Sequence, residues 1–168
     1  MGKVILVCGK IGSGKTTYAH KLAEKLGAVI ITQDEIMNGL FGNELYYSDR
    51  EKYHQYADWV QKYVKRKAGE AAKAGATAIC ENGFWPRSER DELRKLYEYM
   101  GVEYELHYMD TPEEQQLKNI QKRNEAVLRK ELNEAFMDEE VIDLCRRSFE
   151  KPDESEIDVR VKFQYSDK

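Results

Sequence analysis

The sequence is poor in cysteine and histidine, and both shortages exclude particular kinds of site. Of its 168 residues, three are cysteines and three are histidines, and all of them are widely spaced. Cys8, Cys80 and Cys145 form no metal-like pair, and their odd number argues against a disulfide framework. We therefore expect Cys8 and Cys80 to be reduced packing residues in buried strands, and we expect no metal cluster built on histidine.

Long apolar runs and surplus positive charge are also missing. No apolar run approaches the length that spans a bilayer, and the N-terminus lacks the charged-then-apolar pattern of a secretory signal. We therefore expect a cytoplasmic protein without a membrane partner. The formal net charge of -4 counts against duplex DNA or RNA as the usual partner, although a local basic patch remains compatible with it. The length predicts one domain, residues 1–168, with a sizeable core.

One stretch near the start carries the strongest motif in the chain. The segment Gly9-Lys10-Ile11-Gly12-Ser13-Gly14-Lys15-Thr16 fits the pattern of a glycine-rich phosphate loop that ends in Lys-Thr. Glycines let the chain wrap closely around phosphate oxygens, the Lys15 ammonium supplies a point charge, and the Thr16 hydroxyl can bind Mg²⁺. The helix that follows directs its positive dipole end and its unpaired N–H groups at the same anion.

The context of this motif supports the interpretation. Val4 to Cys8 is a continuous apolar run, as in a parallel strand buried on both faces, and the apolar stripe after the loop is helical as far as Gly27. Strand, loop and helix in this order favour a nucleoside triphosphate site over a merely glycine-rich turn or a loop that has lost its ligand. The predicted nucleotide contacts are Gly9, Lys10, Ile11, Gly12, Ser13, Gly14, Lys15, Thr16 and Thr17, together with Arg123 much farther along the chain.

A second strand, residues 28–31, is followed by Thr32-Gln33-Asp34-Glu35. Ligands of open parallel sheets collect at the carboxyl ends of the strands, so Asp34 is expected near the phosphate loop. A carboxylate there can take a proton from an attacking hydroxyl group or help to hold the magnesium shell. The alternative is that Asp34 or Thr32 only caps a helix over residues 36–41.

The third strand, residues 76–80, leads into the second informative segment, residues 81–87. Glu81 again follows a buried strand at the ligand edge, where it can orient Mg²⁺ or its water, or contact the acceptor. Trp85 is costly to expose and is expected under the pocket or in its wall, and Arg87 is a further candidate for substrate contact. Ser88 is the predicted cap of a helix that runs to Met100 and closes at Gly101.

Residues 43–74 are rich in aromatic side chains on a charged background. Their spacing predicts a helix from about Ser48 to the turn before Gly75, with Ser48 and Glu51 as a possible capping box. Two interpretations stay open for the aromatic side chains: a packing face, or a wall of the acceptor pocket formed by the loop with Tyr46 and Tyr47. The basic cluster is interpreted first as a solvated face. Its members are Lys62, Lys65, Arg66 and Lys67.

The last third of the chain contains candidate arginines for phosphoryl transfer. A strand over residues 102–109 precedes a helix with Thr111 as its expected cap and Pro112 at its first position. An arginine that closes over the transferring phosphoryl group stabilises its charge; Arg123 is our first candidate and Arg129 the second, although an ordinary charged helix face explains both. A helix at about 138–149 and a strand over 157–163 complete an alternation of strands and helices.

With these segments laid out, the sequence resembles the P-loop kinase-like proteins grouped as AAA-type ATP-binding proteins. That group is related to the kinase domain of phage polynucleotide kinase, zeta toxins and chloramphenicol phosphotransferase. The resemblance covers nearly the whole chain and rests on five segments. These are the phosphate loop, the Thr-Gln-Asp-Glu after the second strand, Asn82 to Arg87 with Glu89 and Arg90, Lys122-Arg123-Asn124, and Phe149-Glu150-Lys151-Pro152.

The resemblance implies an α/β three-layer sandwich with a five-stranded parallel sheet, and Mg-ATP as phosphoryl donor. It also implies that Asp34 deprotonates the acceptor hydroxyl group and that Arg123, in a lid of about residues 112–135, meets the transferring phosphate. Two positions depart from the family pattern. Met37 stands where polynucleotide kinase-like members carry a phosphate-gripping arginine, and Glu81 replaces an aspartate that is common in the branch.

We therefore predict an ATP-dependent kinase that acts on a hydroxyl group of a small molecule. In this prediction Lys15, Asp34 and Arg123 are catalytic, Asp34, Glu81, Trp85 and Arg87 contact the acceptor, and Thr16 and Glu81 hold the metal. Two alternatives remain: a polynucleotide 5′-hydroxyl kinase, which Met37 and the net acidity disfavour, and a nucleotide-binding switch or ATPase module without an acceptor. The sequence leaves open the acceptor, the preferred nucleotide base and the oligomeric state.

Overall fold

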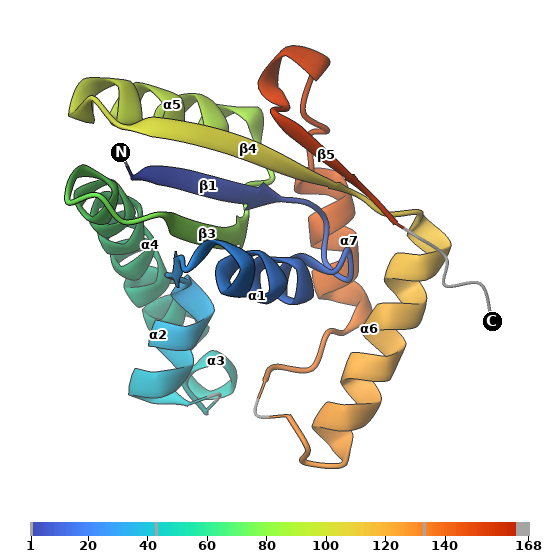
Figure 1. Cartoon of the computed structure of the whole chain (residues 1–168). Helices are drawn as coiled ribbons and strands as arrows, with labels where there is room; N and C mark the ends of the chain where they lie inside the picture. The colour runs from blue at the N-terminus through green and yellow to red at the C-terminus, as the bar shows by residue number, and fades with distance from the viewer. Residues whose placement is uncertain (1, 43, 133, 164–168) are drawn as a thin grey trace.

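A parallel five-stranded sheet forms the middle layer of the molecule, with strand order β2-β3-β1-β4-β5 (Figure 1). The computed structural model describes residues 2–42, 44–132 and 134–163. The strands are β1 Lys3–Cys8, β2 Val29–Ile30, β3 Ala78–Gly83, β4 Glu103–Asp110 and β5 Val159–Lys162. The helices are α1 Lys15–Leu26, α2 Gln33–Phe41, α3 Glu44–Ser48, α4 Arg50–Lys73, α5 Arg87–Met100, α6 Glu113–Leu128 and α7 Glu139–Ser148, with a 3₁₀ turn η1 at Glu154–Glu156.

Helices cover both faces of this sheet because its central strand is apolar on both sides. Ile5 and Val7 of β1 pack with Ala19 and Ala23 of α1 on one face. Val4, Leu6 and Cys8 point to the opposite face, where they join side chains of α4 and α5. A strand buried on both faces reads as a continuous apolar run, as in parallel sheets between helices. The predicted three-layer α/β sandwich is therefore confirmed.

The strands and their connecting helices follow the sequence prediction closely. Gly27 and Gly101 end α1 and α5 in the left-handed conformation, as expected of glycine at a helix C-terminus. Cys8 and Cys80 are buried free thiols, as predicted, and Cys145 on α7 is also buried and free. No helix in the described ranges is both long and apolar enough to cross a bilayer.

The helix N-termini differ from the prediction in three places. Asp49 rather than Ser48 caps α4, because its carboxylate accepts a hydrogen bond from the backbone N–H of Lys52. Helix α5 begins directly after Pro86, so Ser88 lies inside the helix and does not cap it. Pro112 and not Thr111 occupies the cap position of α6. The short helix α3 and the turn η1 were not predicted.

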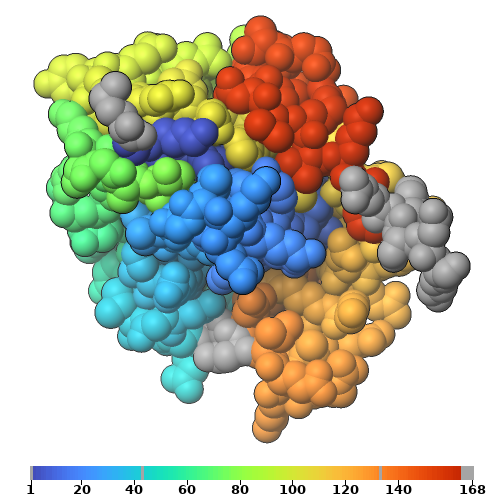
Figure 2. All heavy atoms as spheres, viewed as in Figure 1, coloured from blue at the N-terminus to red at the C-terminus, as the bar shows by residue number. Residues whose placement is uncertain are grey.

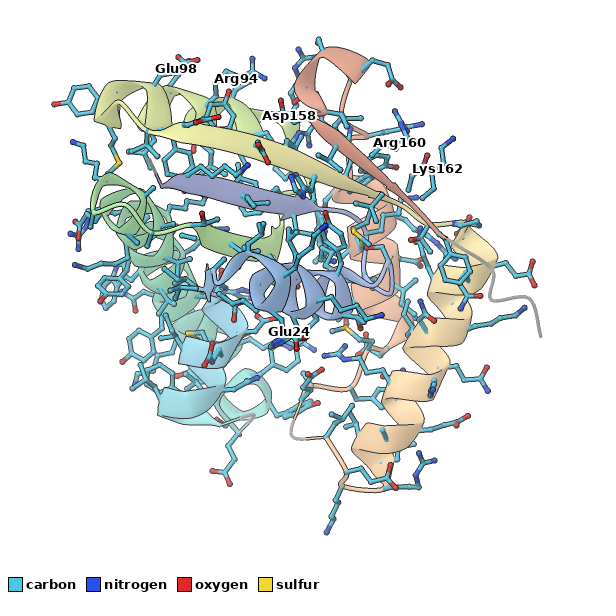
Figure 3. All side chains as sticks on the ribbon, viewed as in Figure 1. Glu24, Arg94, Glu98, Asp158, Arg160 and Lys162 are labelled. Carbon is cyan, nitrogen blue, oxygen red and sulfur yellow. The ribbon has the colours of Figure 1, made fainter. Side chains whose placement is uncertain are left out.

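The carboxyl ends of β1 and β3 and the N-termini of α1 and α2 meet at one edge of the sheet. β1 and β3 are neighbours, and the backbone N–H of Gly9 after β1 donates to the carbonyl of Gly83 at the end of β3, at 3.1 Å. The other edge of the sheet is β5, which carries Arg160 and Lys162 and follows directly after Asp158 (Figure 3). The topology therefore gathers the predicted site residues of the first three strands at one end of the molecule.

Candidate active site

The loop between β1 and α1 has the backbone conformation that its glycines allow. Gly12 and Gly14 have φ angles of 71° and 90°, in the region that side chains with a Cβ rarely adopt. Gly14 is the N-cap of α1, and no side chain caps this helix end. Its first N–H groups therefore remain for a ligand, and the positive end of the helix dipole favours an anion there.

Helix α6 supports the phosphate loop from behind. Asn119 Nδ2 donates to the carbonyl of Gly12 at 2.8 Å, and Thr111 Oγ1 donates to the carbonyl of Ser13 at 2.8 Å. Gly12 lies so close to α6 that a Cβ at this position would be 2.4 Å from the backbone oxygen of Gln116. Thr111, expected as a helix cap, thus fixes the phosphate loop. These contacts hold the loop in the shape of an anion cradle.

Lys15 folds back over this loop. Its Nζ donates to the backbone carbonyls of Lys10 at 2.9 Å and Gly9 at 3.1 Å. Burial lowers the pKa of the Lys15 ammonium group, and the nearby carboxylate of Glu81 opposes that shift most strongly. A half-buried cation held by two neutral carbonyl groups is placed to exchange them for phosphate oxygens.

Thr16 and Glu81 form the link between the phosphate loop and β3. The hydroxyl group of Thr16 donates to the carboxylate of Glu81, at 3.2 Å from Oε2 and 3.3 Å from Oε1. Burial raises the pKa of Glu81 to about 7, against the opposing effects of the Lys15 charge and the Thr16 hydrogen bond. The carboxyl group is therefore close to half-protonated at neutral pH.

These two oxygen donors fit the coordination chemistry of Mg²⁺. Magnesium prefers oxygen ligands and keeps several waters, so one hydroxyl and one carboxylate beside substrate phosphates are a typical protein contribution. Within the described ranges, no group of three or more His, Cys, Asp or Glu side chains converges as an all-protein metal site would need. Thr16 and Glu81 would thus hold the ion together with phosphate oxygens.

Asp34 lies in the first turn of α2, and Thr32 caps that helix by accepting a hydrogen bond from the backbone N–H of Glu35. The capping alternative for Asp34 is thereby excluded. Its carboxylate is open to solvent yet surrounded by protein on several sides, and this burial raises its pKa. The charge of Arg123 lowers that pKa again, Glu134 raises it, and Lys15 lowers it. The Asp34 carboxylate is therefore close enough to Lys15 and Arg123, the two predicted catalytic cations, for their charges to lower its pKa.

Arg123 of α6 reaches this cluster, whereas Arg129 does not. Arg123 Nε donates to Glu134 Oε2 at 2.5 Å, and the arginine is largely shielded from solvent. Arg129 lies at the exposed end of the helix and pairs with Glu131 at 3.0 Å. Of the two arginine candidates, the geometry favours Arg123.

The segment after α6 returns toward the site and carries Glu134. Asn124 fixes it to α6 through two hydrogen bonds with Met137, one to its carbonyl at 2.8 Å and one from its N–H at 2.9 Å. The hydroxyl group of Tyr47 on α3 accepts a hydrogen bond from the N–H of Phe136 at 3.2 Å. Figure 2 shows the surfaces of α2 and α3 on one side and of α6 on the other, with α1 above them. Residues 134–137 connect these two sides.

Of the two further predicted substrate contacts, Trp85 lies at the end of β3 and Arg87 is turned away from it. The Trp85 indole lies directly against Gly83, and its Nε1 is one of three buried side-chain polar atoms in the described chain that lack a partner. Arg87 is half-exposed and pairs with Asp153 at 2.5 Å. The structure therefore keeps Trp85 beside the end of β3, but it does not bring Arg87 to Asp34.

Two functional features were missed by sequence reasoning. Arg90, nearly inaccessible to solvent, pairs with Glu156 at 3.0 Å and donates to the carbonyls of Phe84 and Trp85, which fixes the turn after β3. Tyr53 of α4 lies near Asp34, since burial and then the Asp34 charge raise its pKa. The helical spacing of the aromatic residues indicated that Tyr53 lies on one face of a helix. That spacing is the same for a pocket wall and for a packing face, so it did not predict the position of Tyr53 near Asp34.

Comparison with known protein families agrees with this geometry. The sequence profile of the family described as "AAA domain" matches residues 4–152. The chain belongs to the AAA domain family. No curated protein matches the sequence significantly.

Solved structures share the fold of this AAA domain at low sequence identity. The Mycobacterium tuberculosis APS kinase CysC, in complex with AMPPNP and APS, is 20% identical with a TM-score of 0.69, over 98% of this chain and 90% of that one. A sugar kinase from Janibacter sp. HTCC2649 is 18% identical with a TM-score of 0.66, over 96% and 86% of the two chains. A chain of the Pnkp1/Rnl/Hen1 RNA repair complex is 20% identical with a TM-score of 0.64, over 89% of this AAA domain and 46% of that chain.

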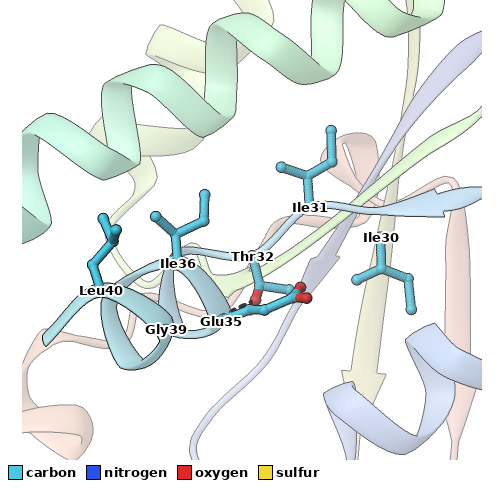
Figure 4. Close-up of a pocket in the computed structure, with 7 residues that line it drawn as sticks. All are labelled: Ile30, Ile31, Thr32, Glu35, Ile36, Gly39 and Leu40. Atoms are coloured by element: carbon cyan, nitrogen blue, oxygen red, sulfur yellow. Dashed lines mark hydrogen bonds between the residues drawn. The ribbon is translucent and has the colours of Figure 1, made fainter. Parts of the chain in front are cut away.

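A hollow beside α2 is separate from the cluster formed by Lys15, Asp34 and Arg123 (Figure 4). It has a volume of about 430 Å³ and a mostly apolar lining that includes Ile31, Glu35 and Leu40. Asp34 does not line it. Successive residues of a helix point in different directions, so Glu35 faces this hollow while its neighbour Asp34 faces the cations of the phosphate site.

Proposed function

We propose that this AAA domain is a cytoplasmic kinase that transfers the γ-phosphoryl group of Mg-ATP to a hydroxyl group of a small-molecule acceptor. One observation carries the proposal. The charges of Arg123 and Lys15 act on the carboxylate of Asp34, and Lys15 also acts on Glu81, which is hydrogen-bonded to Thr16 at the end of the sheet. A phosphate loop alone would serve a switch or an ATPase equally well. A carboxylate beside the phosphate loop, on the separate helix α2, supplies the general base that a second substrate with a hydroxyl group requires.

Each residue has a distinct role in this proposal. The loop N–H groups and Lys15 bind the phosphate oxygens of ATP, and Lys15 exchanges its two carbonyl partners for them. Asp34 accepts the proton of the acceptor hydroxyl group. Burial raises its pKa, while the charges of Arg123 and Lys15 lower it; the net shift is upward, which makes Asp34 a stronger base than an ordinary aspartate.

Arg123 stabilises the transferring phosphoryl group after it leaves Glu134. Charge spreads over the equatorial oxygens during transfer, and a guanidinium group placed there acts electrostatically without covalent chemistry. Thr16 and Glu81 hold Mg²⁺, which when bound neutralises charge on the phosphate oxygens. We propose that residues 112–135 act as the lid that carries Arg123 to this position.

The polynucleotide kinase alternative receives less support from the structure. Met37, at the position of the phosphate-gripping arginine, is buried with 1% exposure and presents no charge to an acceptor. A polynucleotide acceptor would need basic side chains for its phosphates, but Lys62 pairs with Asp58 and Arg87 pairs with Asp153, and neither is directed at Asp34. A small acceptor is therefore the better-supported substrate.

A γ-phosphate transfer assay tests the proposal. The purified protein with Mg-ATP is offered sugars, nucleosides, amino sugars and 5′-hydroxyl oligonucleotides, beside the variants Asp34→Asn and Glu35→Gln. We expect transfer to one class of acceptor, a loss of on the order of 10²–10⁴-fold in Asp34→Asn with ATP binding retained, and native activity in Glu35→Gln. ATP hydrolysis that is indifferent to Asp34, without transfer to any acceptor, would instead support the switch or ATPase interpretation.

A further inference from the structure

The charges around Asp34 constrain the acceptor. The carboxylates of Asp34 and Glu134 act on each other there, because the Glu134 charge raises the pKa of Asp34. Two cations, Arg123 and Lys15, lower that pKa. In the proposed function, which this inference extends, both cations turn toward the phosphate groups of ATP. The acceptor side is then left with negative charge.

Glu134 is the residue most affected by this change. Its partner in the structure is Arg123 at 2.5 Å, and its side chain is only 41% exposed. When Arg123 moves to the transferring phosphoryl group, Glu134 loses that partner while its charge still acts on the carboxylate of Asp34. Leaving a partly buried carboxylate unpaired beside like charges is unfavourable, so a replacement cation at this position would favour the catalytic arrangement.

Aromatic side chains of α3 and α4 adjoin the segment that carries Glu134, and we call them the aromatic wall. The rings of Tyr46 and Tyr53 lie edge to face at 5.1 Å between centroids, and those of Tyr46 and Tyr47 at 5.2 Å. Tyr47 joins this wall to the segment of Glu134 through its hydrogen bond with Phe136. Aromatic faces attract cations, and the Arg50 guanidinium group already lies 5.3 Å from the Tyr46 ring centroid.

The cation on the Tyr46 ring, Arg50, is directed to a different carboxylate. Arg50 lies 3.7 Å from Glu140, at the start of α7. Within the described residues, the charges that lower the pKa of Asp34 are those of Arg123 and Lys15. A phosphorylated or carboxylated acceptor would meet carboxylates without a dedicated cation, whereas a positively charged acceptor would meet carboxylates and ring faces.

We propose that the acceptor is a hydroxylated amine, of the amino sugar or amino alcohol class, whose ammonium group replaces Arg123 on Glu134. The ammonium group lies between Glu134 and the Tyr46–Tyr53 wall, and the reactive hydroxyl group faces Asp34. The hydroxyl oxygen forms the new bond to the γ-phosphorus, the bond from that phosphorus to the bridging β–γ oxygen breaks, and ADP leaves. The hydroxyl proton passes to Asp34, and the amine stays protonated throughout. Binding of the acceptor thus releases Arg123 for phosphoryl transfer.

Matched acceptors test this inference directly. The γ-phosphate transfer rate is measured for amino sugars and amino alcohols and for their N-acetylated forms, which keep the hydroxyl groups but lose the charge. Glucosamine with N-acetylglucosamine, and kanamycin with its N-acetylated form, are suitable pairs. We expect kcat/KM to be at least about tenfold higher for the amine, the ratio that corresponds to about 1.4 kcal/mol. Equal rates, or transfer only to neutral or anionic acceptors, would refute the inference and leave the kinase proposal intact.

The variant Glu134→Gln separates this role from a structural one. It should raise KM for the amine and bring the ratio of amine to N-acetylated acceptor close to one, while KM for ATP stays unchanged. Glu131→Gln removes a carboxylate that pairs with Arg129 at the exposed end of α6 and should keep the native ratio. An unchanged ratio in Glu134→Gln contradicts the inference. Transfer to no acceptor, with hydrolysis indifferent to Asp34→Asn, overturns the kinase proposal and this inference together.

Discussion

Thr16 Oγ1 lies 3.2 Å from Glu81 Oε2, so the first turn of α1 is hydrogen-bonded to the end of β3 across the edge of the sheet. The contact joins a residue of the phosphate loop to a carboxylate that is 65 positions away in the chain. In the proposed function these two oxygen donors beside the Lys15 ammonium hold Mg²⁺. The protonation state of Glu81 then governs how well the pair holds the ion.

Mg-nucleotide binding should depend on pH near neutrality. Burial raises the pKa of Glu81 to about 7, and only the ionised carboxylate binds the metal. Affinity should therefore fall as the pH decreases below 7, by up to about tenfold per unit, and level off above that value. Titration calorimetry between pH 6 and 8, in buffers of different ionisation enthalpy, should detect proton release on binding. Glu81→Gln should bind more weakly and without this pH dependence, and a flat profile for the native protein would refute the assignment.

Replacing Arg123 should slow phosphoryl transfer without weakening ATP binding. An arginine that acts on the transferring phosphoryl group contributes on the order of 10³–10⁵ in kcat. We expect Arg123→Ala to lose activity in this range with little change in KM for ATP. Arg129→Ala removes an exposed arginine directly after the same helix and should keep native rates. If steady-state kinetics give the two variants equal activity, Arg123 is not the lid arginine.

Gly12→Ala should destroy nucleotide binding, whereas Gly27→Ala should only reduce stability. Both glycines have positive φ angles, 71° and 60°, so alanine costs about 1–2 kcal/mol of backbone strain at either position. A Cβ at Gly12 would also lie 2.4 Å from Gln116 O and 2.8 Å from Ile120 Cγ1, while nothing lies within 4 Å at Gly27. Nucleotide titration together with thermal unfolding of both variants distinguishes the effects. Native ATP affinity in Gly12→Ala would contradict the close approach of the loop to α6.

The Arg90–Glu156 pair should contribute strongly to stability. Their side chains are 3% and 2% exposed, and removing one partner leaves a buried charge, which typically costs about 3–5 kcal/mol. Arg90→Met should lower the free energy of unfolding by this amount in urea denaturation. Arg87→Met breaks an exposed pair on the same helix and should cost at most about 1 kcal/mol. A similar decrease in the free energy of unfolding in the two variants would show that burial does not make the Arg90–Glu156 pair more important for stability than the exposed pair.

The Arg90–Glu156 pair should also make the free energy of unfolding depend on pH in the acidic range. Burial acts to raise the pKa of Glu156, but the hydrogen bonds from Arg90 and from the Asp153 backbone outweigh it and hold the pKa below its usual range. A depressed carboxyl pKa contributes stability above the unfolded value, near 4.3, and this contribution disappears as the pH falls through the lower folded value. The unfolding free energy measured from pH 6 to pH 3 should therefore fall less steeply in Glu156→Gln than in the native protein.

Local patterns were enough to predict most elements but not all of their ends. The run Val4 to Cys8 and the stripe before Gly27 predicted β1 and α1, because a doubly buried strand and an amphipathic helix have different periods. The cap of α6 was predicted wrongly at Thr111. That hydroxyl group instead donates to Ser13 O, 98 positions away, and such a long-range competitor leaves no trace in the local sequence.

The sequence by itself determined the phosphate loop, the order of strands and helices, and the placement of carboxylates after two strands. These features follow from local chemistry: glycine conformations, hydrophobic period, and the rule that parallel strands end at one edge. Only the tertiary structure decided that Arg123 rather than Arg129 approaches Asp34, that Arg87 turns away to Asp153, and that Tyr53 lies near Asp34. Those relationships depend on how separate helices pack, and packing joins side chains through space without regard to their separation along the chain.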